Sequence, residues 1–132
     1  MKTRFLTILT CIVLLSCSTQ DSDCDPDIYC DTVPYDYGYI DVKLTYNGVG
    51  IPIILYKGYL EDNVILEIDT AYGDLHYFYQ EVGERYAVEA YYPEAGNTVI
   101  ALDGGKLVQD DFYNCGDRCY NEPTLDLDLK KI

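Results

Sequence analysis

From residue 39 onward the chain alternates between apolar and polar residues, and this pattern constrains the fold more than any other feature. In residues 39–46, Ile40, Val42 and Leu44 share one side of an extended chain, while Asp41 and Lys43 share the other. Such alternation is typical of a β-strand with one buried face. Further segments of strand character are residues 51–56, 63–70, 75–80, 86–92, 98–103, 106–109 and 124–130. None has a convincing helical period, so we expect an all-β, antiparallel two-sheet sandwich of about seven strands, of immunoglobulin or prealbumin type.

Turn residues and strand faces add two local predictions. Asp103-Gly104-Gly105 lies between two short strand segments, which predicts a β-hairpin at that point. In the last segment, Leu125, Leu127 and Leu129 alternate with aspartates. We expect these three leucines to enter the core.

The N-terminal region has the features of an export signal. Lys2 and Arg4 precede an apolar run over residues 5–15, which is shorter than the ~20 residues of a membrane-spanning helix. The run ends in Leu14-Leu15-Ser16-Cys17, which resembles a bacterial lipobox. We therefore expect residues 1–16 to be a lipoprotein signal peptide and Cys17 to carry the lipid, whereas Cys11 leaves with the signal. The alternative is an ordinary signal peptide with Cys17 as a spare thiol.

A strongly acidic segment follows the expected lipid. No basic residue lies between Cys17 and Lys43, and the whole chain has a net charge of −14. Such a charge repels nucleic acid and anionic head groups and favours cationic partners. We expect residues 17–38 to be an extended tether and residues 39–132 to be the sandwich domain. The spaced aspartates weakly resemble a calcium loop, and they also resemble the surface-export signal of Bacteroidota-type lipoproteins.

Four cysteines remain for the exported domain: Cys24, Cys30, Cys115 and Cys119. An even number in an exported chain predicts two disulfides, for which three connectivities exist. Cys115 and Cys119 can close on each other around Gly116, and we favour such local pairs slightly. Bridges between the N-terminal and C-terminal segments are the alternative and would stabilise the fold more, because they close longer loops. Neither spacing is the CxxC of a zinc ribbon, so we expect no metal here.

Several short motifs resemble one known domain family. Residues 42–56 run from a strand through a Gly-Pro-containing turn into an apolar strand, and Gly83-Glu-Arg-Tyr86-Ala-Val88 comes later. Both resemble carboxypeptidase-regulatory-like (prealbumin-like) domains over roughly half of the exported chain. The sequence departs from that pattern in lacking aspartate after Thr70 and in the cysteine hairpin after Phe112. The whole layout is similar to small lipoproteins of Bacteroidota, and the resemblance implies a non-catalytic accessory module.

The residue types present exclude several catalytic chemistries. The segment from residue 39 contains no serine, and His76 is the only histidine of the chain. A Ser-His-Asp triad and a multi-histidine metal site are therefore impossible, and disulfides would consume the thiols of any Cys-His pair. Carboxylates are plentiful, and oxygen-rich calcium sites stay open at Asp110-Asp111 or Asp103. We nevertheless expect no enzyme, no catalytic residues, no cofactor and no resident metal.

Tyrosine is unusually frequent, with 15 copies and no tryptophan. Tyr91-Tyr92 should present one ring to each face of its strand, and several tyrosines on one face would form a platform for protein or glycan. We expect an outer-membrane or cell-surface lipoprotein, anchored in the membrane by its lipid, whose sandwich contacts another envelope protein. The alternative is a glycan- or calcium-binding surface lipoprotein.

Overall fold

The computed structural model describes residues 24–132, so the predicted signal peptide, Cys17, Asp21 and Asp23 lie outside the described residues. Nine strands and one short 3-10 helix follow in chain order. They are β1 (Tyr37–Lys43), β2 (Ile51–Lys57), η1 (Leu60–Asp62), β3 (Val64–Ala71), β4 (Leu75–Glu81), β5 (Arg85–Glu94), β6 (Asn97–Lys106), β7 (Asp111–Asn114), β8 (Asp117–Tyr120) and β9 (Thr124–Asp128).

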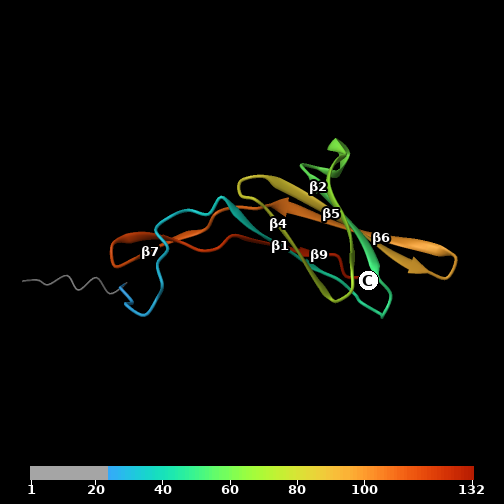
Figure 1. Ribbon diagram of the computed structural model, residues 1–132, viewed down its shortest axis with the longest axis horizontal. Helices are drawn as coiled ribbons and strands as arrows, with labels where there is room; N and C mark the ends of the chain where they lie inside the picture. Colours follow the sequence, from blue (N-terminus) through green and yellow to red (C-terminus); the bar gives the residue numbers. More distant parts are fainter. Residues whose placement is uncertain (1–23) are drawn as a thin grey trace, which may run out of the picture.

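Two sheets pack face to face, which confirms the predicted all-β sandwich (Figure 1). One sheet has the order β4-β1-β9 and the other has the order β3-β2-β5-β6. Neighbouring strands are antiparallel except β1 and β9, which run parallel. The parallel pair arises because the last strand returns to the first after the chain has completed the opposite sheet.

The core lies between the two sheets and is built mainly from alternate residues of β1, β9, β2 and β5. β1 contributes Ile40 and Val42, and β9 with the residue after it contributes Leu127 and Leu129, as predicted, while Leu125 is only half-buried. From the other sheet come residues Ile51, Ile53, Leu55, Tyr86, Val88, Ala90 and Tyr92. Because successive strand side chains point to opposite faces, this inward set defines which residues face outward.

The predicted hairpin at Asp103-Gly104-Gly105 is wrong, because β6 runs through these residues without a turn. The β5–β6 turn lies instead at Gly96, which has a φ of 81°. Gly104 lies where β5 and β6 approach each other closely. A Cβ at this position would lie 2.8 Å from the carbonyl oxygen of Tyr86. Leu107, expected in a separate strand, is buried just beyond the end of β6.

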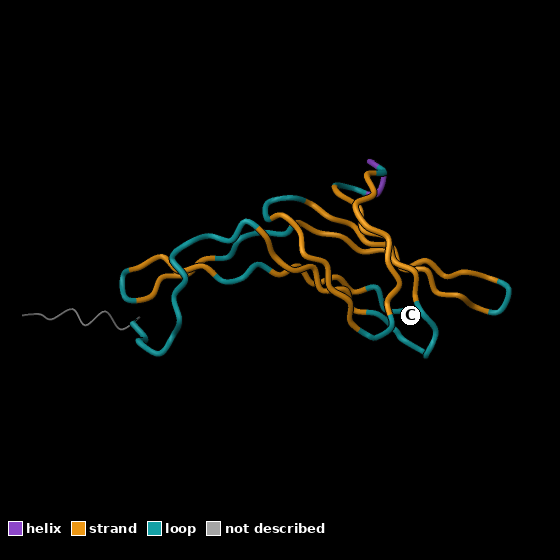
Figure 2. Tube along the Cα trace, viewed as in Figure 1, coloured by secondary structure: helices purple, strands orange, loops and turns teal. Residues whose placement is uncertain are grey.

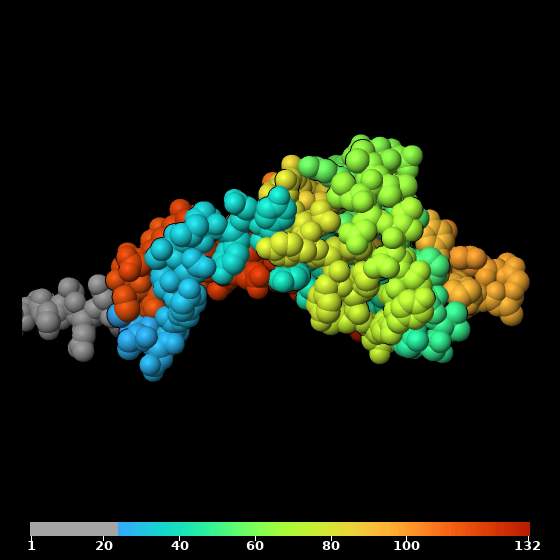
Figure 3. All heavy atoms as spheres, in the orientation of Figure 1, coloured from blue at the N-terminus to red at the C-terminus, as the bar shows by residue number. Residues whose placement is uncertain are grey.

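A disulfide-linked arm projects from the sandwich. We use "arm" for residues 24–36 together with the hairpin of β7 and β8, which lie side by side at one end of the molecule (Figure 2). The hairpin turns through Cys115 and Gly116, whose φ angles of 52° and 86° are those of a tight hairpin turn. In the space-filling view, the arm is a narrow extension beside the broader sandwich (Figure 3).

The slightly favoured local disulfides are wrong, and the long-range alternative holds. Cys24 pairs with Cys115, and Cys30 pairs with Cys119. The hairpin register explains why Cys115 and Cys119 do not pair. Cys119 lies opposite Phe112, well along the ladder from the turn that contains Cys115. Residues 24–30, in the middle of the expected tether, are therefore covalently joined to the β7–β8 hairpin.

Candidate functional site

The outward face of the four-stranded sheet is the most distinctive surface of the sandwich. On β2, Pro52, Ile54 and Tyr56 alternate with core residues and so point away from the core. The strand register places further residues on the same side. We call this set the apolar face: Pro52, Ile54, Tyr56, Ile68, Ala87, Glu89, Tyr91, Pro93, Thr98, Ile100 and Leu102.

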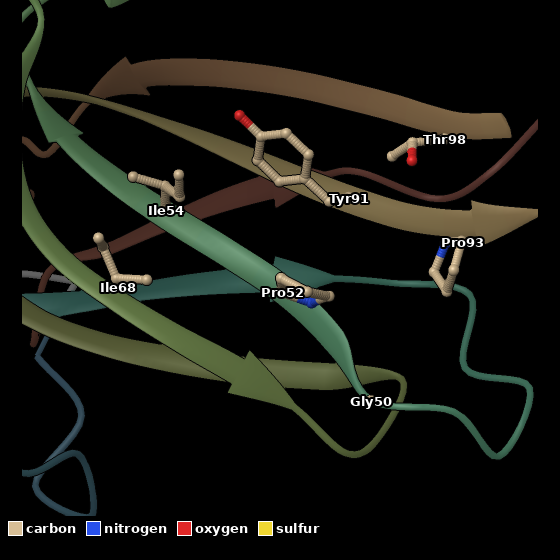
Figure 4. A pocket seen from close by; sticks show the side chains of 7 residues that line it. All are labelled: Gly50, Pro52, Ile54, Ile68, Tyr91, Pro93 and Thr98. Atoms are coloured by element: carbon tan, nitrogen blue, oxygen red, sulfur yellow. The ribbon is translucent and has the colours of Figure 1, made fainter.

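A groove of about 440 Å³ lies on this face near the start of β2. Its lining comes from all four strands and the loop before β2: Gly50, Pro52, Ile54, Ile68, Tyr91, Pro93 and Thr98. Figure 4 shows the Tyr91 ring over β5, with its hydroxyl pointing away from Pro93 toward the level of Ile54. The groove therefore has aliphatic and proline walls and a tyrosine hydroxyl toward one end.

One carboxylate lies within the apolar face and is held by two phenols. Tyr56 Oη donates to Glu89 Oε2 at 2.8 Å, and Tyr91 Oη donates to the same oxygen at 2.6 Å. Burial, followed by the hydrogen bond to Glu89, raises the pKa of Tyr56 to about 12. The pKa of Tyr91 is also raised, chiefly by its hydrogen bond to Glu89. Both hydroxyls therefore stay protonated at neutral pH and fix the position of the carboxylate.

The outward face of the three-stranded sheet has different chemistry. Tyr37, Tyr39, Tyr77 and Tyr79 lie there, all exposed, and we call them the tyrosine platform. The Tyr79 ring centroid is 5.6 Å from that of Tyr37 and 5.0 Å from that of Tyr39. These four tyrosines therefore share one outward face, and their role as a platform for protein or glycan stays a prediction.

Carboxylates lie beside the tyrosine platform. Asp41 lies with Tyr39, Tyr77 and Thr124 around a shallow hollow of about 290 Å³. Burial, followed by the neighbouring charge of Asp126, raises the pKa of Asp41. Exposed rings beside oxygen acceptors match the general requirements of a polyhydroxylated ligand, which stacks its C–H surfaces and donates from its hydroxyls.

His76 contacts an aspartate and a phenylalanine. Its Nε2 is 3.5 Å from Asp69 Oδ2, and its ring packs edge-on against Phe78 with centroids 4.8 Å apart. Because Asp69 belongs to β3 and His76 to β4, this contact joins the edges of the two sheets.

Two of the carboxylates considered for calcium, those of Asp103 and Asp111, are engaged with protein groups. Asp103 accepts from the backbone N–H of Asp128 at 2.9 Å, and Asp111 pairs with Arg118 at 2.7 Å. The Arg118 guanidinium lowers the pKa of Asp111. Across residues 24–132, no three His, Cys, Asp or Glu side chains are grouped as a metal site would require.

Sequence reasoning missed the Tyr56–Glu89–Tyr91 cluster, although it placed Tyr91 and Tyr92 on opposite faces. That part is confirmed, because Tyr92 is buried in the core while Tyr91 faces outward. The missing information was the register of β2 against β5, which sets Tyr56 opposite Ala87 and Ile54 opposite Glu89. Register between strands 33 residues apart has no local signal.

Within residues 24–132 no helix has the length and apolar character needed to cross a bilayer. In comparisons with known proteins, no family model, no curated protein and no solved structure matches this chain. The resemblance to carboxypeptidase-regulatory-like domains therefore stays a prediction.

Proposed function

We propose that this chain is a lipid-anchored envelope protein, at the outer membrane or cell surface, whose sandwich binds another envelope protein through the apolar face. The observation that supports the proposal best is the exposure of large aliphatic side chains on that face. Ile68 is 67 % exposed, Ile100 is 53 % exposed and Leu102 is 51 % exposed. Contiguous apolar side chains around a groove are typical of interaction surfaces.

The arm suits an anchored protein of this kind. With the lipid on Cys17, the chain would leave the membrane and reach the arm at Cys24, where the first disulfide fixes it to the hairpin. The second disulfide, between Cys30 and Cys119, joins the N-terminal part of the arm to β8. The sandwich would then stand off the membrane on a short, covalently braced spacer, with its sheet faces accessible from the side.

Lipid attachment can be tested with two cysteines of the same chain. Cells expressing the full chain are fed an alkyne-labelled palmitate, and the protein is examined for label after click chemistry. We expect the label to be lost in Cys17→Ser and kept in Cys11→Ser, the matched control. Equal labelling of both variants would reject Cys17 as the lipid site.

The interaction surface can be tested by photocrosslinking in intact cells. A photoreactive phenylalanine is placed at Ile68 on the apolar face or, as control, at the exposed Tyr113 on the arm. We expect a discrete crosslinked protein from position 68 and none of the same mass from position 113. The same product from both positions, or none from position 68, would contradict the proposal.

The tyrosine platform favours a second candidate, a glycan-binding surface lipoprotein. Four exposed rings beside Asp41 and Thr124 form a flat, polar-edged surface that suits sugar rings better than apolar side chains. Affinity electrophoresis in gels that contain polysaccharide tests it. Retardation that is lost in Tyr39→Ala and kept in Ile68→Ala would favour glycan binding over binding of an envelope protein as the function.

A further inference from the structure

Glu89 is isolated among apolar neighbours on the apolar face. The strand registers place Ile68, Ile54, Glu89 and Leu102 side by side across all four strands. The adjacent outward residues of β5 are Ala87 and Tyr91, and those of β2 are Pro52 and Tyr56. Among the residues that define this face, Glu89 is the one that carries a charge.

We propose that the apolar face binds a segment of a partner protein that presents one arginine or lysine between apolar side chains, and that this cation pairs with Glu89. The inference rests on the proposed function and names the chemistry of its partner. The occupant is a cationic, apolar segment of a different protein.

The geometry around Glu89 favours a cation. The hydrogen bonds from Tyr56 and Tyr91 both end on Oε2, so Oε1 is the oxygen available to accept from an incoming group. The two phenols hold the carboxylate in place before binding, so little side-chain freedom remains to be lost. A guanidinium or ammonium group would complete the set of donors around the carboxylate.

The loss of water around Glu89 on binding makes the face selective for a cationic segment. A segment that covers Ile54, Ile68 and Leu102 also removes water from Glu89, and a buried carboxylate without a counter-charge is costly. A neutral or anionic segment would leave the carboxylate unpaired, whereas a cationic one compensates for the lost water. The chain's net charge of −14 further favours the approach of a cationic partner.

A second copy of this chain does not fit the same requirement. The nearest outward cations of β5 and β6 are Arg85 and Lys106, which lie beyond Ala87 and Leu102, and Arg85 stacks on the Tyr59 ring. A two-fold contact centred on Glu89 would therefore place two carboxylates against each other without a cation between them. This charge mismatch is why we assign the face to a different protein.

The test uses the full chain in lipid nanodiscs with labelled isoleucine methyl groups and a synthetic peptide. The probe is acetyl-Ser-Ile-Thr-Arg-Thr-Ile-Ser-amide, which in extended form puts its arginine between two isoleucines on one side. The matched probe replaces arginine by citrulline, which has nearly the same shape and no charge. Methyl shifts of Ile54, Ile68 and Ile100 report binding to the face.

We expect saturable shifts at these methyl groups and at least tenfold weaker binding of the citrulline peptide. Glu89→Gln should weaken binding of the arginine peptide to the same extent and remove the difference between the two peptides. The matched control Glu122→Gln, at an exposed loop residue before β9, should keep the wild-type affinity within about twofold.

Equal binding of both peptides to the wild-type chain, or shifts confined to other methyl groups, would overturn the inference. If Glu89→Gln does not fold, the comparison of the arginine and citrulline peptides on the wild-type chain still tests the inference. The outcome is separable from the proposed function. Crosslinking at position 68 in cells without discrimination between the peptides would reject the cation and retain the protein contact.

Discussion

Gly104 shows how a single residue sets the distance between two strands. A Cβ at this position would lie 2.8 Å from the backbone oxygen of Tyr86 and 3.2 Å from the Cα of Ala87. Both neighbours are backbone atoms of β5, so neither moves without disturbing the β5–β6 ladder. Gly73, in the turn between β3 and β4, is different, because its added Cβ would meet nothing closer than 3.8 Å.

We predict that Gly104→Ala lowers the free energy of unfolding by about 1–3 kcal/mol, the usual cost of overpacking a close contact. Gly73→Ala should change it by less than about 0.5 kcal/mol. Urea unfolding followed by tyrosine fluorescence measures both, since the chain has 15 tyrosines and no tryptophan. Similar losses in the two variants would show that the close approach at Gly104 is not what requires glycine there.

Among the elements, those whose signal is local were predictable from sequence. β1 and β9 were placed within a few residues, because alternation such as that of Ile40 and Val42 needs only neighbouring positions. The prediction of a hairpin at Gly104 was wrong because glycine is favoured both in turns and where two strands approach closely, and the residue type alone does not distinguish the two. The β1–β9 parallel pair and the Glu89 cluster depend on non-local register, which residue types alone do not specify.

The two disulfides interleave along the chain, because Cys30 lies inside the loop closed by Cys24–Cys115 while its partner Cys119 lies outside it. Each spans a long segment, with separations of 91 and 89 residues, so either one alone closes a loop that contains every strand of the two packed sheets except β9. In the chain-entropy description a loop of that size is worth about 4–5 kcal/mol. Once one bridge exists, the other adds only a small ring of roughly ten residues, which is worth about 3 kcal/mol.

We therefore predict non-additive losses of stability. Replacing Cys24 and Cys115 by alanine should cost about 3 kcal/mol, and replacing Cys30 and Cys119 should cost a similar amount. Replacing all four should cost about 7 kcal/mol, more than the sum of the two pairs. Urea unfolding of the three variants under non-reducing conditions measures this. If the variant without all four cysteines loses no more stability than a variant without one pair, the bridges stabilise only the arm.

For the whole molecule, the two outward sheet faces provide separate surfaces with different chemistry. The apolar face carries aliphatic side chains around one fixed carboxylate, and the tyrosine platform carries exposed rings beside Asp41. The arm projects from one end of the sandwich and leaves both faces uncovered (Figure 1). A protein contact on one face therefore leaves the other free, so the sandwich has room for two ligands of different class.

Net charge sets how this molecule responds to salt. With 23 acidic and 9 basic residues, like charges repel across the folded surface, and that repulsion is screened as the Debye length falls from about 30 Å at 0.01 M to about 10 Å at 0.1 M. The described residues also contain ion pairs of lysine and arginine, such as Lys43–Asp126 at 3.0 Å, which salt weakens. Exposed pairs of this kind contribute only about 0–1 kcal/mol each.

The balance between charge repulsion and ion pairs predicts the direction in which salt changes the stability of the folded chain. Because the excess of negative charge outweighs a few exposed pairs, we expect the urea midpoint to rise between 10 mM and 200 mM sodium chloride. Potassium chloride should give the same rise, since screening depends on ionic strength and not on the identity of the cation. A midpoint that falls with either salt would mean that the ion pairs dominate. A rise with only one of them would point to specific cation binding by the carboxylates.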